Sequence, residues 1–143
     1  MFTGTLGFLS NFDETPFFVP RLRRQVASGE HAFNALKTLD PAEQNHVLGA
    51  PDPGESKRRG RRVTLRPGWN TGMRVWAMQR VLTAKFAVPD LNQRLVATDD
   101  RMLVETNGWH DQFWGSCFCP KHERIPGTNM LGELLMAIRA HSR

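Results

Sequence analysis

The sequence is poor in cysteine and has no tyrosine. Its two cysteines, Cys117 and Cys119, are too few for a disulfide framework and too close together to bridge comfortably. No stretch approaches the roughly 18 apolar residues that a membrane helix needs. The N-terminus lacks a basic segment followed by an apolar run, so the sequence shows no signal peptide. We therefore expect a cytoplasmic protein with no membrane partner.

Two common catalytic motifs are also missing. There is no Gly-x-Ser-x-Gly elbow, which leaves nucleophilic catalysis of the Ser-His-Asp kind without support. There is no Walker loop, and Gly4 and Gly7 are too closely spaced to form a phosphate loop. No internal repeat or low-complexity tract is visible. A chain of 143 residues fits one core, so we predict a single domain over residues 1–143.

Positive charge, in contrast, is in excess. The chain has 19 Lys and Arg against 14 Asp and Glu, a formal net charge of +5, which favours anionic partners. Much of this excess lies in one run, Lys57-Arg58-Arg59-Gly60-Arg61-Arg62. The run fits a solvated loop as well as it fits a binding surface for phosphate on a nucleotide or a nucleic-acid backbone. Both interpretations stay open on the sequence alone.

The pattern of apolar and turn residues predicts a mostly helical chain. The clearest helix spans about 129–139, where apolar residues recur at helical spacing on one face. The other expected elements are a hairpin in residues 1–20 with arms at 8–9 and 17–19, a helix starting near Ser28, a loop over 49–60, a helix over 71–86, a short helix capped by Asp90 and a strand over 102–104. The expected fold class is α+β, predominantly helical, with a small β-sheet.

Four side chains that can bind metal lie close together in the sequence: His110, Cys117, Cys119 and His122. Structural zinc sites usually separate their first two cysteines by two to four residues, whereas one residue separates Cys117 and Cys119. The spacing therefore favours two incidental thiols in a loop. We expect no metal and no other cofactor.

Acidic and aromatic residues give the richest chemical signal. Glu30 falls in the first turn of an expected helix, and Lys37 follows seven residues later, so the two share one face. Asp111 precedes Trp114 by three residues in a polar stretch, where a tryptophan is more often a stacking platform than a core residue. An acid near an aromatic face suits an enzyme that holds a flat base and cleaves the attached sugar. A helix-dipole contact for Glu30, a solvated Lys37 and a turn-forming Asp111 stay open as simpler interpretations.

Five runs, in order and spanning nearly the whole chain, resemble the NADAR family, which includes the YbiA-type N-glycosidases. The runs are Phe8-Leu9-Ser10-Asn11-Phe12; Gly29-Glu30-His31-Ala32-Phe33 with Lys37; Gly60-Arg61-Arg62-Val63 leading to Leu65-Arg66-Pro67-Gly68-Trp69; Met78 to Lys85-Phe86; and Leu103-Val104-Glu105 with Asp111-x-x-Trp114-Gly115 and Gly127-x-Asn129-x-Leu131-Gly132. Each run is weak alone, but the ordered set is specific. The chain departs from the family in its long link from Ser116 to Pro126, which replaces a short Gly-rich link, and this puts the identity of the substrate in doubt.

The resemblance implies a YbiA-like fold and an N-glycosidase that removes ADP-ribose from guanine in modified DNA or a nucleotide. It also allows ribosylamino-pyrimidine phosphates of riboflavin synthesis as substrates. A non-catalytic module that binds ADP-ribose or nucleic acid is the alternative from another class. Carried over by position, the catalytic residues are Glu30, Lys37 and Asp111. The implied substrate-binding residues are Ser10, Asn11, Phe12, His31, Arg61, Trp114, Gly115 and Asn129.

Both implied substrates are glycosylamines, in which the sugar is attached through an exocyclic amine. A glycosylamine can open to an imine that a lysine intercepts, or water can attack directly with a carboxylate as base. We expect Glu30 to transfer protons and position water, and Lys37 to form a Schiff base or stabilise anionic groups, with Lys85 as its rival. Asp111 is expected to orient the base or ribose, and Trp114 to stack on the base. The residues expected to meet phosphate are Arg61, Arg62 and Arg66.

Overall fold

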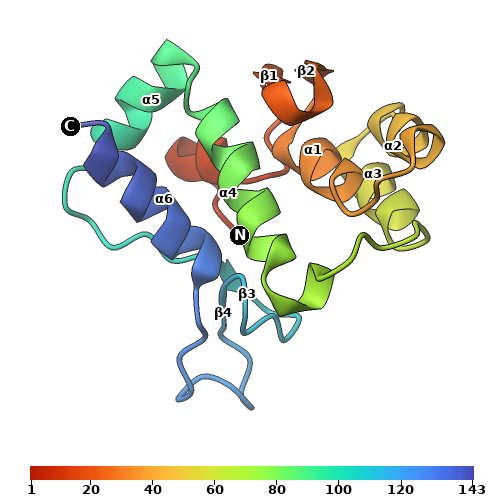
Figure 1. Ribbon diagram of the computed structural model, residues 1–143. Coiled ribbons are helices and arrows are strands. Elements are labelled where there is room, and N and C mark those ends of the chain that lie inside the picture. Colours follow the sequence, from red (N-terminus) through yellow and green to blue (C-terminus); the bar gives the residue numbers. More distant parts are fainter. The chain divides into compact units, whose positions relative to one another are not determined.

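Helices make up most of the ordered structure in the computed structural model, which describes residues 1–143 (Figure 1). A first unit comprises Met1–Ser10 and Pro89–Arg143, and a second unit comprises Asn11–Val88. The elements in chain order are η1 (Gly4–Leu9), β1 (Phe17–Val19), η2 (Pro20–Leu22), β2 (Arg24–Val26), α1 (Gly29–Ala35), α2 (Pro41–Leu48), α3 (Pro53–Gly60), η3 (Trp69–Thr71), α4 (Met73–Lys85), α5 (Pro89–Val96), β3 (Thr106–Asn107), β4 (Ser116–Cys117) and α6 (Met130–His141). The predominantly helical α+β fold class is confirmed. No helix combines the length and the apolar character needed to cross a membrane.

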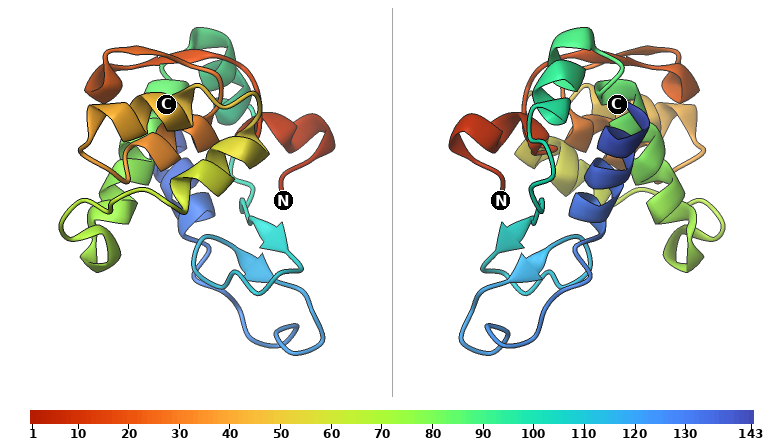
Figure 2. Two further views of the ribbon diagram at one scale, coloured as in Figure 1. Left: turned by 90° about the vertical axis from the view of Figure 1, so that its right-hand side faces the viewer. Right: turned by 90° about the vertical axis from the view of Figure 1, so that its left-hand side faces the viewer.

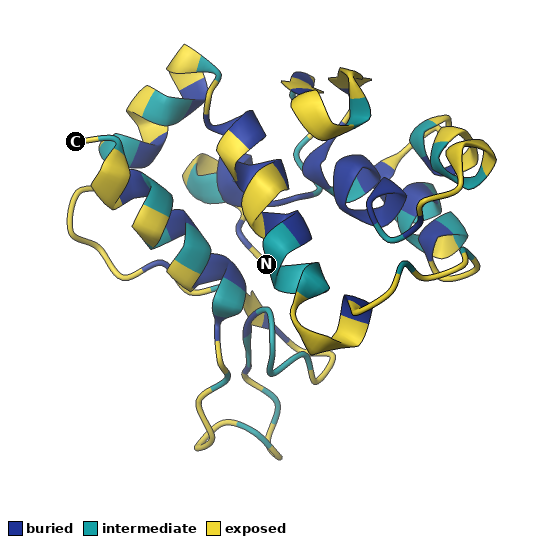
Figure 3. Cartoon of the chain, viewed as in Figure 1, coloured by how far each residue is buried: buried dark blue, intermediate teal, exposed yellow.

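Helix α1 is the buried centre of the second unit, as its dark blue ribbon in Figure 3 shows. The expected N-cap is confirmed, because the Ser28 side chain accepts a hydrogen bond from the backbone N–H of His31. Helices α2, α3 and α4 all pack against α1. Because these helices enclose α1, its polar side chains are fixed in defined positions, as a catalytic group requires.

The expected N-terminal hairpin is wrong in one arm. Residues Gly4–Leu9 form the 3-10 helix η1, in which Phe8 and Leu9 are both buried. A strand would place consecutive residues on opposite faces, so two adjacent buried residues do not fit one there. The second arm is confirmed as β1, but its antiparallel partner is β2, reached through η2 and a left-handed Arg23 (φ 55°).

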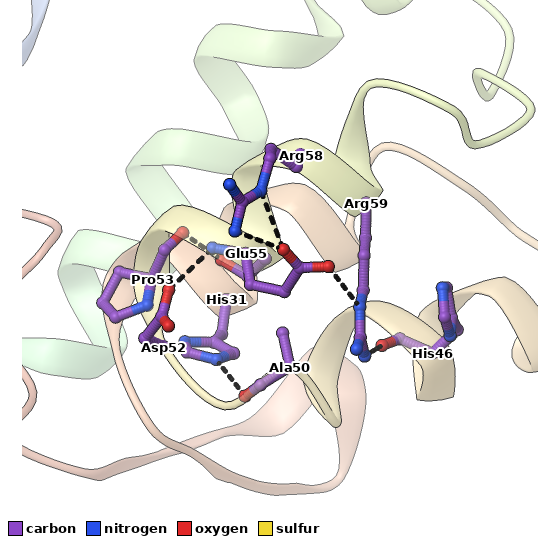
Figure 4. Close-up of polar contacts among 9 residues, drawn as sticks. His31, His46, Ala50, Asp52, Pro53, Glu55, Arg58 and Arg59 are labelled. Carbon is purple, nitrogen blue, oxygen red and sulfur yellow. Dashed lines mark hydrogen bonds and ion pairs between the residues drawn. The ribbon is translucent and has the colours of Figure 1, made fainter.

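The expected loop over 49–60 is also wrong, because most of it forms α3. Pro53 stands at the start of this helix, where its missing N–H costs nothing, and the Asp52 side chain caps the N–H of Glu55. The basic run therefore begins on a helix. Glu55 bonds the side chains of both Arg58 and Arg59, as Figure 4 shows, and so partly neutralises two of these charges.

In the first unit, α5 packs on α6. Strand β3 runs parallel to β4, and Figure 2 shows the two strands side by side below the start of α6. The strand expected over 102–104 is wrong. The Asn129 amide takes the place of a partner strand: it donates to the Leu103 carbonyl at 2.8 Å and accepts from the Glu105 N–H at 2.9 Å. These backbone hydrogen bonds are made to a side chain far along the sequence. The local alternation of apolar and polar residues therefore gives no sign of them.

We predict that Gly115→Ala destabilises the protein by about 1–3 kcal/mol, the usual cost of forcing extra atoms into packed structure. A Cβ at residue 115 would overlap the Glu105 carbonyl, which is backbone and cannot turn aside. Chemical denaturation measures the change. The matched control is Gly7→Ala, whose added methyl would meet no atom within 4 Å. Equal stability of the two variants would contradict the prediction.

Candidate functional site

Glu30 lies in the first turn of α1 and is held by two asparagines of the second unit. Its backbone N–H donates to the Asn11 carbonyl at 2.9 Å. The Asn34 side-chain amide donates to the Glu30 carbonyl at 2.8 Å and to Glu30 Oε1 at 3.0 Å. Asn11 and Asn34 are both buried. The carboxylate is thus fixed at one oxygen by a neighbour one helical turn away.

Burial raises the pKa of the Glu30 carboxyl, and this is the dominant influence on it. The Asn34 hydrogen bond and the charges of Lys57, Lys37 and His31 lower the pKa, but by less. A carboxyl with a raised pKa keeps its proton to higher pH than an ordinary carboxyl, which favours its use as a proton donor. Glu30 therefore has the properties of a general acid.

Lys37 follows the end of α1 and is half-buried. Its Nζ lies 5.9 Å from the centre of the Phe33 ring. Burial is the main cause that lowers the pKa of the Lys37 ammonium; Glu30 raises it, and Lys57 and Arg61 lower it further. A lysine with a lowered pKa holds more of the neutral amine, which is the nucleophilic form. The two expected catalytic residues, Glu30 and Lys37, thus each influence the pKa of the other.

Helix α3 and the turn after it supply the cations around this pair. Lys57 Nζ lies 6.0 Å from the centre of the Phe12 ring, and both Lys57 and Arg61 act on the Lys37 charge. Helix α3 approaches α1 so closely at Gly60 that a Cβ there would overlap the Asn34 side chain. Sequence reasoning missed Asn34, and it named Lys57 only as part of the basic run, without linking it to Glu30 and Lys37. The spacing of four residues from Glu30 to Asn34 was the available signal for the first.

Two amide oxygens beside Glu30 are buried without a hydrogen-bond partner: Asn11 Oδ1 and Asn34 Oδ1. Asn11 Oδ1 faces Gly29, where an added Cβ would come within 2.6 Å. An unpaired buried acceptor costs about 1–3 kcal/mol. This cost indicates that the position of each side chain is set by the contacts of its other atoms. For Asn34, that contact is the hydrogen bond from its amide nitrogen to the Glu30 carboxylate.

The other expected substrate-binding residues of the second unit differ in access. Arg61 is exposed and Phe12 is half-buried, so both can reach a ligand, whereas the Asn11 side chain is buried and donates to Met78 Sδ at 3.2 Å. The structure argues against substrate contact by His31. Its ring is fully buried, with Nδ1 at 2.7 Å from Ser28 Oγ and Nε2 at 2.9 Å from the Ala50 carbonyl, the latter drawn in Figure 4.

Lys85, the rival of Lys37, is fully buried on α4. Its Nζ lies 3.7 Å from Asp13 Oδ2 and 5.6 Å from the centre of the Phe86 ring. A fully enclosed lysine side chain that already faces a carboxylate is out of reach of a substrate. These contacts favour Lys37 as the reactive lysine.

In the first unit, Asp111 shapes the turn that carries Trp114. Asp111 Oδ1 accepts the backbone N–H groups of Phe113 at 3.0 Å and Trp114 at 2.9 Å. The Trp114 ring is half-buried and packs edge-on against Phe113, with 4.8 Å between ring centres. The turn-forming role is therefore the one that the structure supports for Asp111. A contact of either residue with substrate stays a prediction.

Three further expected binding residues lie in the first unit and are buried: Ser10, Gly115 and Asn129. Ser10 donates its backbone N–H to the Gly7 carbonyl at 3.0 Å. Asn129 uses both ends of its amide on the backbone of Leu103 and Glu105, and Gly115 permits close backbone packing. For Gly115 and Asn129, these contacts support a structural role.

A groove on the second unit, between α2 and α3, does not include the Glu30–Lys37 pair. Its lining is Ala42, Glu43, His46, Glu55, Arg58, Arg59, Arg62 and Val63. Glu55 already bonds Arg58 and Arg59, and Arg59 also donates to the His46 carbonyl at 2.8 Å (Figure 4). The perturbed acid and amine, Glu30 and Lys37, lie outside this groove, whose charged side chains are largely paired with one another.

We expect Glu30→Gln to stabilise the fold at neutral pH. Because the folded pKa of Glu30 is raised above its ordinary value of 4.5, the stability linked to its proton is fully present below 4.5 and is lost as pH rises through the folded pKa. The neutral amide escapes that loss. Denaturation curves from pH 4 to pH 8 should show the advantage of the variant over wild type growing with pH. The exposed Glu14→Gln is the control. A pH-independent difference would contradict the expectation.

Comparison with known proteins places these residues in a wider context. The NADAR domain family model matches residues 2–143. The NMR structure of the E. coli protein YbiA is similar, with a TM-score of 0.79 and 30% sequence identity, over 98% of this chain and 82% of that one. No curated protein matches the sequence.

Proposed function

The chain belongs to the NADAR family, and on this premise we propose that it removes ADP-ribose from guanine in modified DNA or a nucleotide. Family membership and the YbiA-like fold suggest a glycosidase-type function. The proposal goes further in naming the substrate and the residues that act on it. It rests first on one observation: Glu30, with a raised pKa, and Lys37, with a lowered pKa, interact in one site.

This pair suits cleavage of a glycosylamine. In the ring-opened imine form of the substrate, the neutral Lys37 amine adds to the sugar C1. The exocyclic amine then leaves with a proton from Glu30, which regenerates free guanine and leaves an iminium between C1 and Lys37 Nζ. Water, deprotonated by the Glu30 carboxylate, adds to C1 and releases ADP-ribose and the free lysine. The sum is substrate plus water giving guanine plus ADP-ribose, with no redox change.

The positive surroundings support a substrate that carries phosphate. Lys57 and Arg61 act on the pair electrostatically, and the chain has a net charge of +5. Cations close to the site attract a diphosphate and also hold the Lys37 pKa down. One set of charges thus serves both substrate binding and activation of the nucleophile.

The test is to incubate the protein with a guanine-ADP-ribosylated DNA oligonucleotide and to follow release of ADP-ribose by mass spectrometry. Release that depends on Glu30 supports the proposal. No release, with turnover of a ribosylamino-pyrimidine phosphate, would move the function to the small metabolite. Binding of ADP-ribose without turnover of either compound would identify a binding module instead.

A further inference from the structure

A second cluster of reactive side chains lies in the first unit, and all its members but His110 fall in the link from Ser116 to Pro126 that departs from the family pattern. The ligand atoms of His110, Cys117, Cys119 and His122 all lie within 4.8 Å of one another. The spacing that favoured two incidental thiols does not account for this convergence of two imidazoles and two thiols. We propose that these four residues bind one zinc ion and form a structural site.

The distances match a tetrahedral ion. Zn–S bonds of about 2.3 Å and Zn–N bonds of about 2.0 Å place tetrahedral ligands about 3.3 Å apart for N···N and about 3.5 Å for S···N. His110 Nδ1 and His122 Nδ1 are 3.4 Å apart. Cys119 Sγ lies 3.4 Å from His110 Nδ1 and 3.2 Å from His122 Nδ1, and Cys117 Sγ lies 3.9 Å from His110 Nδ1. The same nitrogen of each imidazole faces the centre of the cluster.

A hydrogen-bonded frame holds the ligands in place. The buried Asn107 on β3 accepts from the N–H groups of Trp109 and Asp111 and donates to the Asp111 carbonyl, so the loop that carries His110 is closed at its base. His110 itself has a left-handed backbone (φ 69°), a conformation that costs free energy in a residue with a side chain. The frame therefore directs this imidazole toward the thiols at an energetic cost.

Further hydrogen bonds fix the two cysteines. Gln112 accepts the N–H of Cys117 at 2.7 Å, and the N–H of Cys119 points at Cys117 Sγ at 3.4 Å. A backbone N–H that donates to sulfur stabilises the thiolate, which is the form that binds metal. The N–H of His122 donates to the Cys119 carbonyl at 2.9 Å, so a tight turn sets the spacing of the last two ligands.

The chemistry of the four donors selects zinc and a structural role. Two thiolates and two imidazoles in a tetrahedral arrangement are a ligand set that zinc prefers. All four positions are filled by side chains, which leaves none for a water or a substrate. The inference therefore does not depend on the proposed glycosidase activity.

The surrounding segment has little apolar burial to order it. Between residues 108 and 128, only Gly115 and Cys117 are buried. Trp109, Phe118 and Ile125 are exposed. A loop without an apolar core is the setting in which a metal supplies the cross-links that packing does not.

The test is the metal content of the tag-free protein, purified under reducing conditions from zinc-supplemented cells and then dialysed. We expect about one zinc ion per chain, the stoichiometry of a single four-ligand site. Cys119→Ser and His122→Gln should each lose most of it. The matched control is His141→Gln, which changes an exposed histidine of the same unit outside the cluster and should keep the full content.

Cobalt(II) added to the metal-free, reduced wild-type protein provides a readout that needs no variant to fold. The expected result is the intense visible absorption of a four-coordinate cobalt ion with a thiolate charge-transfer band. Chelation of the bound metal should also speed proteolytic cleavage within residues 108–128. Reduced wild-type protein that holds no zinc and gives no cobalt spectrum would overturn the proposal, as would full zinc retention in the Cys119→Ser variant.

Discussion

Glu30→Gln is expected to lower the rate of N-glycosidic cleavage by about 10²–10⁴-fold, the usual contribution of a general acid–base group. The amide keeps the size of the side chain and can still bond Asn34, but it can neither give a proton to the leaving amine nor take one from water. The stabilised fold expected of the same variant separates loss of chemistry from loss of structure. Activity should fall while the free energy of unfolding rises.

The measurement is single-turnover release of ADP-ribose from the modified oligonucleotide across a range of pH. Glu14→Gln serves as the control, because it removes an exposed carboxylate from the same unit. Substrate binding by Glu30→Gln should persist, since the cations of α3 are untouched. An unchanged rate in Glu30→Gln would show that another group transfers the proton.

Lys37→Arg is expected to reduce cleavage to a similar degree, by about 10²-fold or more if the amine is the covalent nucleophile. Arginine keeps the positive charge at this position but stays protonated and cannot form an imine with C1. The substitution therefore separates the two roles left open for the lysine. If the lysine only stabilises anionic groups, arginine should preserve most of the rate.

Borohydride trapping during turnover gives the direct measurement. The wild-type protein should yield a reduced adduct on Lys37, located by peptide mass spectrometry, and Lys37→Arg should yield none. Lys121→Arg, an exposed change elsewhere, should trap like wild type. Absence of an adduct together with an active Lys37→Arg variant would support direct attack by water with Glu30 as base. An adduct on Lys85 would contradict the assignment made from its burial.

Helices with a strong local signal were predictable from the sequence. The Ser28 cap, the apolar repeat of α4 and the stripe of α6 each depend on residues within a few turns. The loop predicted over 49–60 is wrong because proline ends a helix in its interior but is well suited to its first turn, where Pro53 stands. The strand over 102–104 failed because its backbone is satisfied by Asn129, 26 residues beyond Leu103.

In the candidate site too, contacts encoded by local spacing were predictable and contacts made by distant packing were not. Glu30 and Lys37 could be paired from their spacing, because one helix carries the first and ends just before the second. The influence of Lys57 depends on how α3 packs on α1, which no local pattern encodes. The four proposed zinc ligands could not be assigned to one site from the sequence for a similar reason. Their spacing breaks the common rule, and only the parallel pairing of β3 with β4 brings the loop of His110 to the thiols.

The close approach of α3 to α1 at Gly60 lets a residue without a side chain influence the pKa of Glu30 on the neighbouring helix. Lys57 precedes Gly60 on α3, and its charge lowers the pKa of Glu30 while burial raises it. A larger residue at position 60 would wedge α3 away from α1 and weaken that attraction across the added gap. The wedge would also displace Asn34, whose amide holds the Glu30 carboxylate, so position 60 can alter the acidity of the proposed catalytic carboxyl from a neighbouring helix.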